Sequence, residues 1–262
     1  MNRIEERMAL LQEKDEKAFI TYMTAGLPSM EDSIALLKAQ EEAGIDVVEL
    51  GIPFSDPIAD GPVIQDVSFR SIQKGTTVYG VFDAVADYRA EGGGVPLVFM
   101  LYYNTILHFG VEAFVDRCIE VGVDGLIVPD LPYEEQDEIR AFLGKEGAPV
   151  LIQLVSPISA DRIPMLCEDA RGFIYCVSAM GVTGQEGSFY RSVGDYLANV
   201  KAVSKIPVMM GFGIRTAADV LPYKDSIDGA IVGSHFINLM EQNHYDPETA
   251  KEYVRTFKAE FR

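Results

Sequence analysis

The stretch VVELGIPFSDPIADGPVIQ, residues 47–65, decides how the chain is expected to fold. It opens with the apolar, β-branched residues of a buried strand, but Glu49 interrupts the run. Alternate side chains of a strand point to opposite faces. The two sets are Val48, Leu50 and Ile52, and Val47, Glu49 and Gly51. If the first set packs under helices, Glu49 faces the interior of a closed sheet, where burial should raise its pKa towards neutrality.

Eight apolar runs of strand length recur along the chain, and segments with apolar residues at helical spacing lie between them. The runs are AFITYMTAG from Ala18, DVVELGIP from Asp46, VPLVFMLYYN from Val95, GLIVPD from Gly125, APVLIQLVS from Ala148, GFIYCVSA from Gly172, IPVMMGFG from Ile206 and GAIVGS from Gly229. Such alternation predicts an α/β fold, a (β/α)8 TIM barrel, which accounts for every run. An open doubly wound sheet is the alternative, although MTAGLPS stands where its GxGxxG turn would follow the first strand.

We expect a single domain over residues 1–262, because no Ser/Gly linker, low-complexity tract or shift in composition divides the chain. An extra N-terminal helix precedes the first strand. The interval between the second and third strands is the longest, which predicts an insertion after strand 2. We expect a loop and a short helix over DPIADGPVIQDVSFRSIQKG, ahead of the regular helix near VYGVFDAVADYRA.

The charge balance narrows the classes of partner. The chain has 40 acidic and 22 basic residues and a net charge of −18, so its field repels nucleic acid. No run approaches the roughly 20 apolar residues of a membrane span, and the N-terminal segment has no signal-peptide core. Cys118, Cys167 and Cys176 lack disulfide or metal spacing, which fits a reducing compartment and buried side chains. We therefore expect a cytoplasmic protein without nucleic-acid or membrane partners.

Two acids near the end of the second strand form the first candidate site. Glu49 falls near the C-terminal mouth of the barrel, where enzymes of this architecture keep their active sites. Alone it could equally be a structural carboxylate, but Asp60, in the loop leaving the same strand, can reach over the same mouth. Two acids in unlike environments can divide acid/base work from charge stabilisation. Asp56 and Asp66 are better explained as turn or cap residues.

Glycine-bearing turns after the sixth, seventh and eighth strands form the second candidate site. They are GVTGQEG from Gly181, GFGIRT from Gly211 and GSHF from Gly233. Backbone N–H groups that bind phosphate need residues without side chains at the closest approach, together with a helix N-terminus. Barrels often build this site after strands seven and eight, with a short helix for which SHFINLMEQN from Ser234 is the candidate. We therefore expect a phosphorylated substrate.

Aromatic and apolar side chains at strand ends could line a flat pocket, although each taken singly could be a core residue. They are Tyr22, Met100, Tyr102, Ile127, Tyr175 and Phe212. The histidines, at positions 108, 235 and 244, have no metal-ligand spacing, so we expect no metal site. His235 falls near the expected phosphate site.

The motif ELGIPFSDPIADGPVIQ, with MTAGLPS upstream and GVTG, GFGI and GS downstream, resembles the tryptophan synthase alpha chain along nearly the whole sequence. The resemblance implies a lyase that cleaves indole-3-glycerol phosphate by a retro-aldol reaction into indole and glyceraldehyde 3-phosphate, with no cofactor in this chain. It also implies a beta-chain partner that carries pyridoxal phosphate, forms an alpha2beta2 assembly and receives indole through a tunnel.

The resemblance also implies roles for single residues. Glu49 matches the general acid/base, and Asp60 matches the group that hydrogen-bonds the indole N–H. Tyr175 matches a tyrosine of the pocket wall, and Thr183 matches a loop residue that closes towards Asp60. The remaining matches are Gly184, Gly213, Gly233 and Ser234 in the phosphate cradle, and Asp56 and Pro57 in the contact with the beta chain.

Four positions depart from the family's pattern, namely Tyr22, Pro129, Gln153 and Ala179. They put loop dynamics and pocket shape in doubt but not the reaction. Two alternatives stay open: a sugar-phosphate epimerase or isomerase of the same architecture, and an alpha-like protein that only activates a beta partner. The Pro-rich context of Glu49 and Asp60 argues against the first, and the presence of both acids argues against the second.

Overall fold

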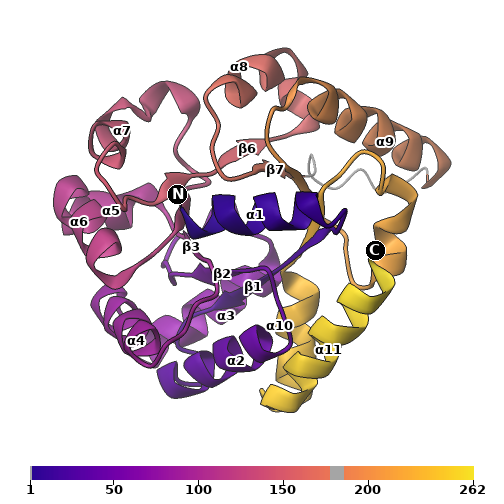
Figure 1. Ribbon diagram of the computed structural model, residues 1–262. Helices are drawn as coiled ribbons and strands as arrows, with labels where there is room; N and C mark the ends of the chain where they lie inside the picture. The colour runs from indigo at the N-terminus through magenta and orange to yellow at the C-terminus, as the bar shows by residue number, and fades with distance from the viewer. Residues whose placement is uncertain (1, 178–185) are drawn as a thin grey trace.

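Parallel strands form the centre of the molecule in the computed structural model, which describes residues 2–177 and 186–262 (Figure 1). The strands are β1 (Ala18–Thr24), β2 (Val47–Gly51), β3 (Leu97–Met100), β4 (Gly125–Ile127), β5 (Val150–Leu151), β6 (Gln153–Val155), β7 (Ile174–Cys176), β8 (Val208–Met210) and β9 (Gly229–Val232). Their order in the sheet is β5-β4-β3-β2-β1-β9-β8-β7-β6, and every neighbouring pair is parallel.

The sheet closes at the fifth expected strand. This strand is divided at Ile152 into β5, which pairs with β4, and β6, which pairs with β7. The Ile152 N–H still donates to the Leu126 carbonyl at 2.9 Å, so the division is local. Because the first and last segments of the sheet order are consecutive in the chain, the strands form a closed ring. The (β/α)8 barrel is confirmed, and the open doubly wound sheet is excluded.

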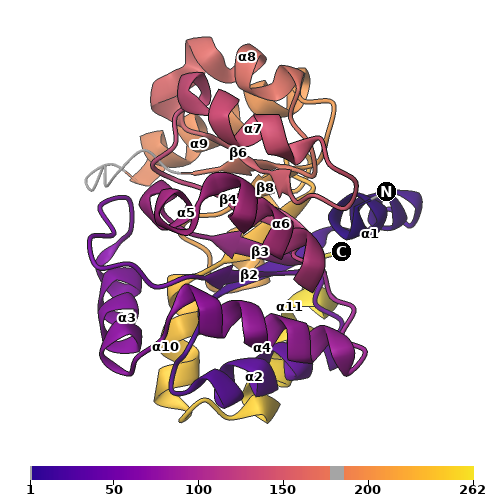
Figure 2. The same ribbon diagram turned by 90° about the vertical axis from the view of Figure 1, so that its left-hand side faces the viewer.

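Helices surround the barrel (Figures 1 and 2). They are α2 (Met30–Glu42), α3 (Pro62–Gln73), α4 (Val78–Ala90), α5 (Tyr103–Phe109), α6 (Val111–Val121), α7 (Asp137–Leu143), α8 (Ile163–Glu168), α9 (Glu186–Val203), α10 (Ser234–Gln242) and α11 (Pro247–Glu260). Short 3-10 turns are η1 (Tyr133–Glu135), η2 (Pro157–Arg162), η3 (Ala217–Asp219) and η4 (Leu221–Tyr223). Within residues 2–177 and 186–262, no helix is long and apolar enough to cross a membrane. The three cysteines are free and buried.

The N-terminal helix α1 (Arg3–Glu13) covers the end of the barrel where the strands begin (Figure 1). Its buried side chains, Ile4, Met8 and Leu11, pack with residues of the barrel interior. Asn2 starts the helix by accepting a hydrogen bond from the Ile4 N–H at 2.9 Å. The expected extra helix therefore exists, and it seals the base of the barrel.

The insertion after β2 consists of a loop and α3, at the opposite end of the barrel from α1 (Figure 2). With 12 residues, α3 is longer than the short helix that we expected, and Pro62 occupies its first turn. Asp66 lies inside α3 and forms an ion pair with Arg70 at 2.8 Å, so it is not a turn or cap residue. Arg70 also contacts Glu241 of α10, which ties the insertion to that helix.

The side-chain alternation of β2 agrees with the expectation from sequence. Val48, Leu50 and Ile52 belong to the core between barrel and helices, whereas Val47 belongs to the barrel interior. Glu49 has the parity of Val47 and is completely buried. The sheet therefore directs this carboxylate inward, towards the end of the barrel where the strands finish.

Candidate active site

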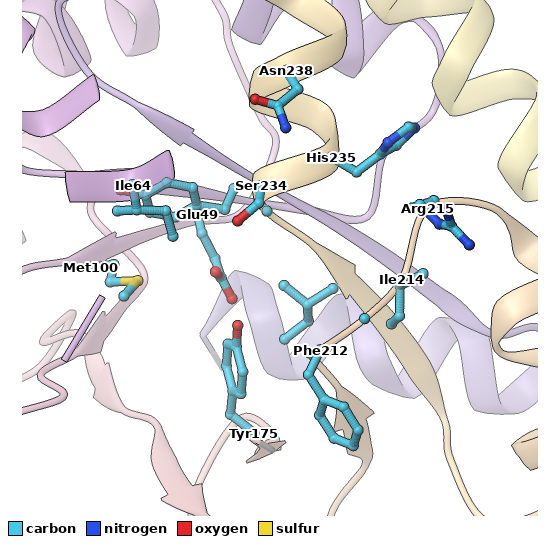
Figure 3. A pocket seen from close by; sticks show the side chains of 15 residues that line it. Glu49, Ile64, Met100, Tyr175, Phe212, Ile214, Arg215, Ser234, His235 and Asn238 are labelled. Atoms are coloured by element: carbon cyan, nitrogen blue, oxygen red, sulfur yellow. The ribbon is translucent and has the colours of Figure 1, made fainter. Parts of the chain in front are cut away.

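A cavity of about 460 Å³ opens at the C-terminal ends of the strands. Fifteen residues line it (Figure 3): Tyr22, Glu49, Ile64, Met100, Tyr175, Gly211, Phe212, Gly213, Ile214, Arg215, Ile231, Gly233, Ser234, His235 and Asn238. Apolar and aromatic side chains dominate around Glu49, and glycines and polar groups lie nearer α10. A ligand with a flat apolar end and an anionic end would match these two parts.

Glu49 is the acid of the cavity wall. It lies in the middle of β2, between Tyr22 of β1 and Val98 of β3. Among the described residues, neither carboxylate oxygen has a hydrogen-bond partner. Burial without compensation raises the pKa of Glu49 to about 8, so its neutral form predominates at pH 7. A buried polar group without a partner is rare in proteins, and here it leaves a proton donor facing the cavity.

Asp60 lies in the loop between β2 and α3 in a different environment. Its Oδ2 atom accepts a hydrogen bond from the Tyr102 hydroxyl at 3.0 Å. The same hydroxyl accepts one from the Ala59 N–H at 2.9 Å, and the Tyr102 ring stacks on Phe54 with centroids 4.9 Å apart. Burial raises the pKa of Asp60 to about 6 although the Tyr102 hydrogen bond opposes the rise. At neutral pH Asp60 is therefore mostly an anion while Glu49 is mostly neutral.

Two tyrosine hydroxyl groups are influenced by the charges of both acids. Burial raises the pKa of the Tyr22 and Tyr175 hydroxyls, and the charges of Glu49 and Asp60 raise both further. The same two carboxyl groups therefore act electrostatically on the same pair of rings. Figure 3 shows the Tyr175 hydroxyl and the Glu49 carboxyl group pointing towards one another.

Glycines make room for these two rings. A Cβ atom on Gly51 would lie 2.1 Å from the Tyr22 hydroxyl oxygen, and one on Gly211 would lie 2.3 Å from a ring carbon of Tyr175. Both separations are far below any real carbon contact, so the backbone at these two strand ends must carry no side chain.

The other end of the cavity is built from backbone. Gly233 precedes α10, which has no side-chain cap and no acid in its first turn, so its first N–H groups remain available. Gly213, in the loop after β8, has a φ of +68° that favours glycine. Ser234 and His235, in the first turn of α10, also line the cavity. Such an end suits an anion, through N–H groups and the helix dipole.

The structure places eight of the expected site residues in the cavity wall: Tyr22, Glu49, Met100, Tyr175, Phe212, Gly213, Gly233 and Ser234. Asp60 and Tyr102 lie beside it and contact each other, whereas Ile127 packs in the barrel interior. Thr183 and Gly184 lie outside the described residues. Sequence reasoning did not identify Ile64, Gly211, Ile214, Arg215, Ile231 and Asn238 as lining residues. For Arg215 the signal was available, because it follows the GFGI turn directly.

The loop before α3 also carries the residues expected to contact a partner. Asp56 is exposed, Pro57 is half-buried, and Ile58 next to them is 85% exposed. No group of three or more His, Cys, Asp or Glu side chains in the described part of the chain could hold a metal ion. The cavity offers the Glu49 carboxyl group, tyrosine hydroxyls and backbone donors, with the Asp60 carboxyl group beside it.

Known proteins share this sequence and this architecture. The family model described as tryptophan synthase alpha chain matches residues 8–262. Tryptophan synthase alpha chains of Lachnospira eligens and Alkaliphilus metalliredigens are 63% and 44% identical, over 99% and 92% of this chain and 99% and 90% of theirs. A crystal structure of tryptophan synthase subunit alpha from Legionella pneumophila superposes with a TM-score of 0.89 at 32% identity, covering 100% of this chain and 98% of the other. The chain belongs to the tryptophan synthase alpha chain family, whose known function is the cleavage of indole-3-glycerol phosphate.

Proposed function

We propose that Glu49 carries the proton in the cleavage of indole-3-glycerol phosphate by this chain, and that Asp60 binds the indole N–H. One observation carries the proposal: Glu49 is fully buried in the cavity wall, no described residue hydrogen-bonds its carboxyl group, and burial raises its pKa to about 8. A carboxylic acid with this pKa can donate a proton at neutral pH and take one back later in the cycle.

The proposed chemistry moves one proton. Glu49 protonates C3 of the indole ring, which makes the ring a cationic electron sink. The resulting carboxylate then takes the proton from the hydroxyl group on the adjacent carbon of the glycerol chain. As the aldehyde forms, the bond from C3 to that carbon breaks, and its electrons restore the aromatic indole. The net change is transfer of a proton from the hydroxyl group to C3, and no metal ion enters any step.

Asp60 supports the cationic intermediate in this proposal. An anion facing the ring N–H stabilises the positive charge that develops there. The hydrogen bond from Tyr102 fixes the orientation of the Asp60 carboxylate and opposes the rise of its pKa. Tyr22, Met100, Tyr175 and Phe212 would surround the ring, and Thr183, outside the described residues, is proposed to close over Asp60.

The phosphate group is proposed to lie at the start of α10. The uncapped first turn of this helix, the Ser234 hydroxyl, and the backbone of Gly213 and Gly233 support this orientation. Gly184, outside the described residues, is proposed to complete the cradle. With the phosphate there, the indole ring extends towards Glu49 and the tyrosines.

A beta chain that carries pyridoxal phosphate is the proposed partner, in an alpha2beta2 assembly to which indole passes through a tunnel. The exposed loop with Asp56, Pro57 and Ile58 supports a contact beside the cavity mouth, because an exposed isoleucine favours burial against another protein. Three observations support a cytoplasmic location. The relatives of this chain belong to a biosynthetic enzyme, its net charge is acidic, and its three cysteines are free.

Release of indole from indole-3-glycerol phosphate tests the proposal. The purified chain is incubated with the substrate, alone and with a tryptophan synthase beta chain, and indole is measured over time. We expect slow release from the chain alone and much faster release with the beta chain. Absence of release in both mixtures would contradict the catalytic assignment and favour a protein that only activates its partner.

A further inference from the structure

The cavity has an unusual charge for a chain that binds a phosphorylated substrate. Of the fifteen described residues that line it, Arg215 is the single lysine or arginine, and Glu49 is the single acid. The whole chain has a net charge of −18, so its long-range field repels a phosphate dianion. A single cation at the end of the cavity where the phosphate is proposed to bind would therefore contribute much of the attraction for the substrate.

Arg215 lies at the end of the cavity where the phosphate is proposed to bind. It follows the Gly213 turn directly, in the loop between β8 and η3. Figure 3 shows Arg215 and His235 on the side of the cavity away from Met100, beyond Ser234 at the start of α10. Burial lowers the pKa of His235, and the charge of Arg215 lowers it further, as expected for two side chains on the same side of the cavity.

The backbone of Arg215 is fixed, whereas its side chain is not. Its N–H donates to Asp219 at 2.9 Å, and its carbonyl accepts from the Tyr253 hydroxyl at 2.7 Å. The Arg215 side chain is 72% exposed, and its guanidinium group lies 3.9 Å from the nearest Asp219 oxygen, too far for a hydrogen bond. The other Asp219 oxygen already accepts from the backbone of Arg215 and Thr216. The guanidinium can therefore leave Asp219 at little cost and turn towards an anion.

We infer that Arg215 recruits the phosphate group and makes the site specific for a phosphorylated substrate. This inference rests on the proposed function, because it adds a charged side chain to the cradle of backbone donors. A guanidinium group can bind two phosphate oxygens at once. Its full charge also attracts a phosphate from a distance at which backbone N–H groups do not. Arg215 is a binding residue here and takes no part in proton transfer.

Arg215→Gln tests the inference in kinetics. We expect KM for indole-3-glycerol phosphate to rise about tenfold with kcat nearly unchanged, because the lost interaction is made equally in the ground and transition states. Added salt should raise KM in the unchanged protein and much less in the variant. Indole glycerol, which lacks the phosphate, should be cleaved with the same kcat/KM by both proteins.

Matched variants separate this effect from general charge and from folding. Lys224→Gln removes an equal charge from the exposed residue that follows η4, outside the cavity lining, and should leave KM unchanged. Arg215→Lys should recover part of the affinity, since it keeps the charge without the paired geometry. An equal rise of KM in Arg215→Gln and Lys224→Gln, or an equal loss with indole glycerol, would overturn the inference.

Binding of glycerol 3-phosphate by calorimetry provides a readout that needs no turnover. We expect about tenfold weaker binding in Arg215→Gln and unchanged binding in Lys224→Gln. If the unchanged protein binds this probe through Arg215 but releases no indole, the proposed function fails and the phosphate site stands. If indole is released normally and Arg215→Gln binds the probe as tightly as the unchanged protein, the inference about Arg215 is wrong.

Discussion

Two carboxylates, one directly before β2 and one in its middle, are buried in opposite environments. Asp46, directly before the strand, is completely buried at the base of the barrel. It accepts hydrogen bonds from Arg7 at 2.6 and 2.8 Å, from Lys258 at 2.7 and 2.8 Å, and from the Phe19 N–H at 2.7 Å. Glu49, three positions later, is equally buried and has no partner among the described residues.

The two buried carboxylates therefore differ in how they affect the stability of the folded state. At the base, two cations and a backbone N–H compensate the cost of burying a charge, and α1, β1, β2 and α11 are held together by them. At the mouth, none of the cations in residues 2–177 and 186–262 compensates Glu49, so the folded state favours the neutral acid. The first carboxylate is expected to serve the fold, and the second is expected to serve proton transfer.

Substitution of Glu49 should give the largest effect. Glu49→Gln removes the proton carrier and should lower kcat for indole release by about a thousandfold. Near pH 4 the free energy of unfolding should change little, because there an amide replaces a neutral carboxyl group of the same shape. Indole release and urea unfolding measure the two quantities, and substantial turnover by this variant would remove Glu49 from the mechanism.

The converse substitution at the base should affect stability instead. Asp46→Asn leaves Arg7 and Lys258 without their counter-charge and should lower the free energy of unfolding by about 3 kcal/mol. Turnover per folded molecule should stay near that of the unchanged protein. A variant of normal stability with impaired turnover would reverse the roles assigned to the two carboxylates.

The pH dependence of stability sharpens the comparison. The pKa of Glu49 rises from 4.5 to about 8 on folding, so the folded state binds the proton more tightly. Relative to Glu49→Gln, the unchanged protein should therefore lose stability as the pH rises from 4.5 to about 8, by about 5 kcal/mol in all, and stay level above that. Asp46→Asn should keep this slope. Parallel stability curves for the unchanged protein and Glu49→Gln would show that burial does not hold the proton on Glu49.

The smallest expected effect concerns the hydrogen bond that supports Asp60. Tyr102→Phe keeps the stacking on Phe54 but removes the hydroxyl, which should lower kcat about fivefold. This hydrogen bond lowers the pKa of Asp60, so the fall of kcat on the acid side should move to higher pH in the variant. Tyr79→Phe, on exposed Tyr79 of α4, is the control. An unshifted profile would separate Tyr102 from the titration of Asp60.

The strand pattern was sufficient to predict the barrel and the direction of Glu49. A strand offers only two orientations for each side chain, and the apolar set of β2 leaves a single choice for the acid. The spacing between strands predicted the insertion but not the length of α3. That length depends on tertiary contacts, such as that of Arg70 with Glu241, which a local sequence pattern does not reveal. The break at Ile152 likewise depends on hydrogen bonding to both neighbouring strands.

Side chains on loops were harder to place. Arg215 reaches the cavity from a loop, where no fixed alternation sets the direction of a side chain, and Ile64 reaches it from the first turn of the inserted helix α3. Ile127 was expected in the pocket from its strand end, but it packs in the barrel interior and is not among the residues that line the cavity. Gln153, which departs from the family's pattern, exchanges two hydrogen bonds with Gln136 at 3.1 and 3.2 Å, and this pairing could not be inferred from spacing.

Gly51 and Gly211 have a consequence for redesign of the site. Each lies against a tyrosine ring, and a methyl group at either position would overlap that ring unless the ring moved. The close approach of the main chain therefore limits where each ring can lie. A version that accepts a bulkier ring system would have to begin by shortening Tyr22 or Tyr175, with both glycines left in place.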